Sequence, residues 1–274
     1  MCCRRVRAID RCLAIGLTIV LAGAAQAAVI SVTQNVVPNL DTLLPQIETL
    51  PLGEESFAFV DRTHELTSAR FDPATGLLTT DVAIGTLVGF PSYLLGAQYV
   101  ANANDNRTAG TSAALNDYMV TYRVDAPSIA YLLLDNRLNG TASNVSDPNT
   151  DDPDLGGNLA WVLNGGWIRV NTGIMPNGQA DYLGIDEGGS VASPDLRVHH
   201  DPGAGVGLNQ FYAIYSKEVM PGEFFTGGIK QATGSGNMYV VAVVAVPEPS
   251  TFALLGFGAA ALVIYRRRKV RISQ

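Results

Sequence analysis

Between Ala28 and Val246, apolar residues mostly alternate with polar ones, and this period of two is the pattern of β-strands rather than of helices. In the segment Tyr118–Val124, tyrosines and valines alternate with Met119, Thr121 and Arg123. Gly, Asn, Pro and Asp residues separate such runs, as turns do. Five further β-prone runs occupy residues 57–60, 131–134, 167–170, 211–215 and 238–244. We therefore predict a mainly β fold, a single β-sandwich or jelly-roll ectodomain over residues 28–245, with no second domain boundary.

Helical segments are expected to be few and short. The two candidates are Asp41–Thr49, which Pro45 interrupts, and Ser92–Val100. The two tryptophans, Trp161 and Trp167, are expected to fill the core rather than to form a platform on which sugars stack.

The amino-terminal end has the three parts of a secretory signal peptide. Four early arginines precede an uncharged apolar run at residues 13–22. Ala25 and Ala27 then supply a small-x-small cleavage pattern, so signal peptidase is expected to cut between Ala27 and Ala28. The alternative is a retained membrane helix, which is disfavoured because the apolar run is too short to span a bilayer comfortably. We predict a signal helix over residues 1–27 and general secretion.

The three cysteines, Cys2, Cys3 and Cys12, all lie within that amino-terminal segment. A mature chain beginning at Ala28 therefore contains no thiol, which excludes disulfides, thiolate catalysis, Cys-ligated zinc and iron–sulfur clusters from it. Such a domain must be held together by its core, and a segment of this length is long enough to form one.

Charge is distributed unevenly along the chain. The net charge is −7, but residues 28–246 hold 9 basic against 23 acidic residues, and both ends are basic. The acidic middle argues against a nucleic-acid partner, because proteins of that class neutralise phosphates with Lys and Arg.

The carboxyl-terminal end also has three parts. Pro247, Glu248 and Pro249 come first, and the prolines keep this part extended and accessible. An apolar run follows at residues 252–265. The third part is a basic cluster that consists of Arg266, Arg267, Arg268 and Lys269. The 14 apolar residues cover only about 21 Å of a hydrocarbon core of about 30 Å, so we expect a marginal transmembrane helix with its basic end in the cytoplasm.

This tail resembles the PEP-CTERM sorting signal of Gram-negative bacteria over residues 246–271. The resemblance rests on Pro247-Glu248-Pro249, the apolar run and the arginine cluster, in that order. It implies processing by an exosortase, an integral membrane cysteine protease, after a transient stay in the inner membrane. It also implies a link to exopolysaccharide and biofilm production, and it says almost nothing about the middle of the chain.

A looser resemblance connects the middle to β-sandwich modules of secreted carbohydrate-active proteins. It rests on Asp61–His64, Leu95–Val100, Asn102–Asn106 and Ala130–Arg137. It implies a polysaccharide as a partner.

The densest acidic stretch spans residues 147–157. Asp147, Asn149 and Asp151 place oxygen ligands at the first, third and fifth positions of a calcium loop. The match then fails, because Asp152 stands where the sharp turn needs Gly and Asn158 stands where a bidentate Glu belongs. A solvated loop is the main interpretation, with calcium as the alternative, and no other cofactor is expected.

Taken together, these patterns favour an exported protein that is anchored through its carboxyl-terminal helix and then reaches the cell surface or the extracellular matrix. Three functions are compatible with them: a structural or interaction protein without enzymatic activity, a carbohydrate-binding module, and, last, a polysaccharide hydrolase or lyase. No catalytic constellation supports the third, since acidic residues are too abundant for any particular carboxylate pair to stand out.

Overall fold

The computed structural model describes residues 29–38, 40–109, 117–138, 152–186, 208–229 and 236–246, with residues 256, 258, 259 and 262. The domain they form is mainly β, as predicted. Its longer strands are β1 (Val29–Gln34), β7 (Gln98–Ala101), β8 (Met119–Val124), β9 (Ser128–Asp135), β11 (Tyr182–Asp186), β12 (Leu208–Val219), β13 (Gly222–Gly227) and β14 (Val240–Ala245). The shorter ones are β2 (Gln46–Ile47), β3 (Ser56–Phe57), β4 (Glu65–Thr67), β5 (Arg70–Phe71), β6 (Thr86–Leu87) and β10 (Ile168–Arg169).

The described strands form one large sheet and two small ones. The large sheet has the order β2-β7-β14-β9-β12-β11-β4-β3, and β10 also pairs with β12. β9 lies near its middle, between β14 and β12, and all but one of its eight residues are buried. A strand that is covered on both faces reads as a continuous apolar run, which is why Tyr131–Leu134 shows no alternation.

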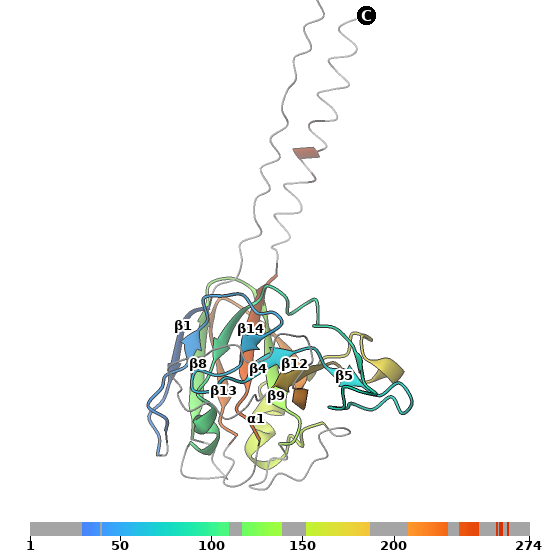
Figure 1. The fold of residues 1–274 in the computed structure, drawn as a ribbon. Coiled ribbons are helices and arrows are strands. Elements are labelled where there is room, and N and C mark those ends of the chain that lie inside the picture. The colour runs from blue at the N-terminus through green and yellow to red at the C-terminus, as the bar shows by residue number, and fades with distance from the viewer. Residues whose placement is uncertain are drawn as a thin grey trace, which may run out of the picture.

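The three-stranded sheet has the order β1-β8-β13, and all of its pairs are antiparallel. Figure 1 shows these strands on one side of the molecule, with β5 on the opposite side. In β8 the residues Val120, Tyr122 and Val124 are buried, whereas Met119 and Arg123 are exposed. The alternation read from the sequence therefore corresponds to one covered face and one solvated face.

Buried tyrosines join the two larger sheets. The ring of Tyr122 on β8 stacks on Phe224 of β13, with 5.0 Å between ring centroids. The hydroxyl of Thr226 on β13 lies 2.7 Å from that of Tyr239, which directly precedes β14. Burial raises the pKa of Tyr122 to about 12. The phenols of this core are therefore held in their protonated form.

Both helix candidates were wrong. Asp41–Thr49 contains bends and the strand β2, and Pro45 leaves no uninterrupted helical stretch there. Ser92–Val100 forms a turn that leads into β7, and Gly96 in that turn has the left-handed φ of 80°. Between residues 29 and 246, the described helical segments are instead α1 (Ala160–Asn164) and the 3₁₀ turns η1 (Asn104–Thr108), η2 (Gly157–Leu159) and η3 (Pro176–Gly178).

The predicted membrane segments fall mostly outside the described residues. The signal helix over residues 1–27 lies outside them entirely. In the run 252–265, the described residues Gly256, Gly258, Ala259 and Leu262 are helical. Within the described part of the chain, no helix is both long and apolar enough to cross a membrane.

Candidate functional site: a cleft beside β13

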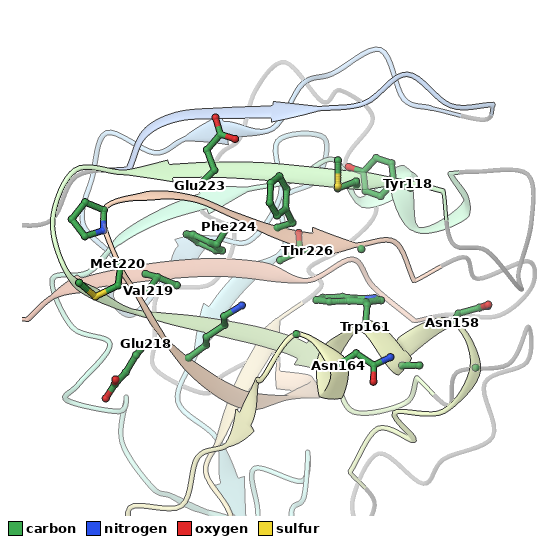
Figure 2. A pocket seen from close by; sticks show the side chains of 18 residues that line it. Tyr118, Asn158, Trp161, Asn164, Glu218, Val219, Met220, Glu223, Phe224 and Thr226 are labelled. Carbon is green, nitrogen blue, oxygen red and sulfur yellow. The ribbon is translucent and has the colours of Figure 1, made fainter.

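A cleft of about 750 Å³ lies along β13, between the end of β12 and the helix α1. Its lining combines aromatic, amide and charged side chains, as Figure 2 shows. The lining residues include Asn158, Trp161, Asn164, Lys217, Glu218, Glu223, Phe224 and Thr226.

Strand alternation decides which side chains of β13 enter the cleft. Phe224 and Thr226 are buried at the cleft, whereas Glu223 and Phe225 alternate with them, are exposed and border it. The turn of Met220 and Pro221 brings β12 back as β13. It ends in Gly222, whose φ of 131° is accessible to glycine and strained for other residues. Among the described strands β13 is the outer one of its sheet, so the cleft follows an edge of that sheet.

The wall opposite β13 is built by Trp161 on α1. Its indole N–H donates to the carbonyl of Gly228, with 3.0 Å between the two atoms. The ring also lies so close to Gly227 that a β-carbon there would be 2.7 Å from Trp161 Cδ1. Only glycine at position 227 lets the indole approach the strand this closely.

The two tryptophans differ in their surroundings. Trp167 is buried, as expected for the core, and meets Phe224 edge to face at 6.4 Å between centroids. Trp161 is only partly buried, packs against Tyr239 and lines the cleft. The prediction of a core position is therefore confirmed for Trp167 and is incomplete for Trp161.

The cleft has a positive charge near its aromatic side chains and negative charges at its rim. The ammonium of Lys217 lies 5.9 Å from the centroid of the Trp167 ring, within the range of a cation–π contact. Glu218 and Glu223 are exposed at the rim, and Figure 2 shows them pointing away from each other on opposite sides. The cleft thus offers one cation and the amide of Asn164 beside an aromatic wall.

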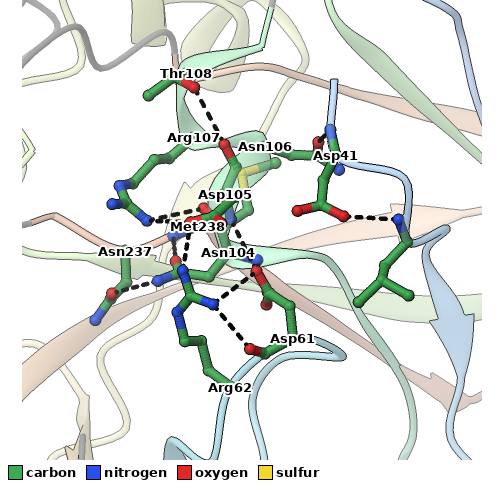
Figure 3. A network of polar contacts seen from close by, with 11 residues as sticks. Asp41, Asp61, Arg62, Asn104, Asp105, Asn106, Arg107, Thr108, Asn237 and Met238 are labelled. Atoms are coloured by element: carbon green, nitrogen blue, oxygen red, sulfur yellow. Dashed lines mark hydrogen bonds and ion pairs between the residues drawn. The ribbon is translucent and has the colours of Figure 1, made fainter. Parts of the chain in front are cut away.

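A separate acidic group lies around η1. Asp41, Asp61 and Asp105 each offer a carboxylate oxygen, and these oxygens lie within 4.8 Å of one another (Figure 3). Arg62 already supplies positive charge there, because its guanidinium is 2.5 Å from Asp105 Oδ1 and 3.6 Å from Asp61 Oδ2. Arg107 adds a second ion pair to Asp105 at 3.2 Å. Oxygen ligands of this kind suit calcium, but the arrangement is that of an internal ion-pair network.

Asp61 is the buried member of this network. Its Oδ1 accepts the N–H of Asn104 at 2.7 Å, and its Oδ2 accepts that of Asp105 at 3.1 Å. Burial raises the pKa of Asp61, and these two N–H groups partly offset that rise. The carboxylate therefore ties the start of η1 to the segment before β4.

A second buried network connects η1 to the large sheet. Asn104 accepts the N–H of Met238 at 2.8 Å and donates to Asn237 at 3.0 Å. Asn237 in turn donates its backbone N–H to Asp135 at 2.7 Å. Two of the segments that carried the looser resemblance, Asn102–Asn106 and Ala130–Arg137, thus meet here in a structural role.

The site residues named from the sequence lie outside the described residues. These are Ala25, Ala27, Ala28, Pro247, Glu248, Pro249, Arg266, Arg267, Arg268, Lys269, Asp147, Asn149 and Asp151. Calcium binding by the last three stays a prediction. Sequence reasoning missed the cleft and the Asp61 network, because no local spacing indicates that Trp161 meets Gly227 or that Asp61 meets Asp105.

The comparison with protein families assigns the tail. The PEP-CTERM protein-sorting motif matches residues 245–269, which include Pro247-Glu248-Pro249 and Arg266–Lys269. The predicted tail signal is therefore confirmed.

The other comparisons concern the whole chain. No curated protein sequence matches it. Among solved structures, it is similar to a β-glucuronidase from glycoside hydrolase family 2, with a TM-score of 0.40 and 12% sequence identity. That match covers 75% of this chain and 14% of the other, so the chain spans about one seventh of that structure's length.

Proposed function

We propose that this protein is exported, sorted by an exosortase, and retained at the cell surface or in the extracellular matrix, with a structural or interaction role linked to exopolysaccharide or biofilm. Its two larger sheets are proposed to form a β-sandwich that has no enzymatic activity. The observation that carries the proposal is the sorting motif at residues 245–269, which begins on the last residue of β14.

The junction between domain and motif supports processing at this place. The backbone N–H of Val246 donates to the carbonyl of Pro127 at 2.9 Å, so the fold holds the chain up to that residue. Pro247 and Pro249 follow at once, and neither can donate a ladder hydrogen bond. A protease in the membrane would thus meet an extended segment directly outside a folded domain.

The rest of the tail fits a temporary anchor in the inner membrane. The apolar run 252–265 is short for a spanning helix, and Arg266–Lys269 would hold its far end in the cytoplasm. The signal peptide over residues 1–27, cut by signal peptidase, would supply the export step.

Replacing Pro247 and Pro249 by Ala should stop processing, because helix could then extend outward through the motif. We expect full-length protein to accumulate in the inner membrane, whereas the native tail is cut in cells that contain an exosortase. The measurement is the intact mass and membrane fraction of the protein, in strains with and without that enzyme. Pro38→Ala, in an exposed turn of the domain, is the matched control and should be processed normally.

Deleting Arg266–Lys269 should instead remove the positive charge that holds the end of the apolar run in the cytoplasm. A larger fraction of the protein should then leave the membrane uncut. If the carboxyl terminus remains Gln274 in both strains with the native sequence, the tail is an ordinary anchor and the sorting proposal is wrong.

The cleft favours carbohydrate binding as a second candidate function. A half-buried indole beside an amide and an ammonium is the mixture of apolar and polar groups typical of small-ligand sites. The rim carboxylates of Glu218 and Glu223 point apart, which supports binding rather than hydrolysis by a facing pair.

Lys217→Met should weaken retention on immobilised alginate, an acidic polysaccharide, by about tenfold or more, because a hydrogen bond to a charged group contributes about 1.5–3 kcal/mol. The substitution keeps the apolar stem that packs near Trp167. Arg123→Met removes an exposed cation of β8 that does not line the cleft and is the control. Equal retention of all three proteins on alginate and on neutral dextran would contradict a polysaccharide site here.

A further inference from the structure

Strands of the large sheet end together where the tail begins. Ala245, the last residue of β14, pairs with Ser128 at the start of β9. Val219, the last residue of β12, pairs with the same Ser128. The tail therefore leaves the domain beside the turns that connect β8 to β9 and β12 to β13.

The three-stranded sheet ends at the same place. Val124 closes β8, and it pairs both with Gly222 at the start of β13 and with Val29 at the start of β1. The turns at residues 125–127 and 220–221 and the beginning of β1 thus surround the tail junction. We refer to these segments, with Val246, as the tail end of the domain (Figure 1).

The tail end presents apolar side chains to solvent. Met220, at the tip of its turn, is 73% exposed, and Ile30 and Val246 are also exposed. Of the residues in the two turns, only Asp125 carries a charge. Single exposed apolar residues are common on protein surfaces, so it is their position around the tail that matters.

Two further exposed leucines belong to the same end. β7 pairs Gln98 with Val243, so continuing this register places Gly96 level with Ala245. Leu95 precedes Gly96, and the backbone of Gly96 bonds to Leu52, two residues after Leu50. Leu50 and Leu95 are both exposed.

The tail is too short to hold this surface far from a membrane. Between Val246 and the apolar run at Phe252 lie five residues, so the two Cα atoms can be at most about 20 Å apart. Hydrophobic side chains this close to a bilayer can enter its headgroup region, where their burial is favourable.

We infer that the tail end of the domain docks on the lipid surface while the tail holds the protein in the membrane, with Met220 the deepest contact. This rests on the proposed function, since it requires residues 252–265 to enter the bilayer. The domain then stands on this end, with η1 and the start of β8 farthest from the lipid.

The test uses the full-length chain in phosphatidylethanolamine–phosphatidylglycerol vesicles that contain nitroxide-labelled lipid. Cys2, Cys3 and Cys12 are changed to Ser, and a fluorescent label is attached through Met220→Cys or, as the control, Val36→Cys. Val36 is 92% exposed and lies just beyond the far end of β1. We expect the nitroxides to quench the label at least about twofold more at position 220, because the two sites are roughly 20 Å apart along the strands.

Flotation of the vesicles separates the two possible failures, with a chain that ends at Val246 as the control for flotation through the apolar run at residues 13–22. A chain that floats but shows equal quenching at positions 220 and 36 overturns the docking surface and leaves the anchor intact. A chain that does not float with the vesicles overturns the anchor and the docking surface together.

Discussion

Replacing Asp135 by Ala should lower the free energy of unfolding by about 3–5 kcal/mol, because it removes the buried carboxylate that balances the charge of the largely covered Arg137 guanidinium. Asp135 is fully buried, and its Oδ2 lies 2.6 Å from a terminal nitrogen of Arg137. The carboxylate also accepts the backbone N–H groups of Arg137 at 3.0 Å and Asn237 at 2.7 Å. Burial raises its pKa, although these partners lower it in part, so the charge is strongly desolvated.

Urea unfolding measures the effect. Asp135→Asn keeps the shape and removes the charge, so it tests whether the ion pair or the hydrogen bonds carry the stability. Glu223→Ala removes an exposed carboxylate and is the control, with an expected change below about 0.5 kcal/mol. A loss smaller than about 1 kcal/mol for Asp135→Ala would show that the network is dispensable.

Raising the pH from 10 to 12 should destabilise the domain through its buried tyrosines. Burial raises the pKa of Tyr122 from 10.0 to about 12 and also raises those of Tyr118 and Tyr239. The pKa of each phenol is higher in the folded than in the unfolded protein. The stability that comes from burying the protonated phenols is therefore fully present below pH 10 and is lost as the pH approaches 12. For Tyr122 alone the loss is about 3 kcal/mol, since one pKa unit corresponds to about 1.4 kcal/mol.

Tyrosinate absorbance and urea midpoints at pH 8, 10 and 11 test this prediction. We expect absorbance to rise together with unfolding rather than before it, because the phenols ionise only when the core opens. Tyr122→Phe should reduce the pH dependence while it removes a hydrogen bond to Thr226. Equal urea midpoints at pH 8 and pH 11 would contradict the prediction that the buried tyrosines have raised pKa values in the folded protein.

Local patterns were sufficient for the β class and for the tail. Each of the six β-prone runs overlaps a strand, because alternation and branched side chains are properties of a few consecutive residues. The sorting signal is likewise contiguous, since the protease and the membrane read prolines, apolar length and basic charge in order along the chain.

Contacts between distant segments were decided only by the tertiary structure. The cleft depends on the close approach of the Trp161 indole to Gly227, and the ion pair between Arg62 and Asp105 depends on η1 folding back toward the segment before β4. The apolar tail end exists because separate turns finish at the same level of two sheets. Strand register fixes which residues share an end or a face, and register arises from packing across the whole domain rather than from any single segment.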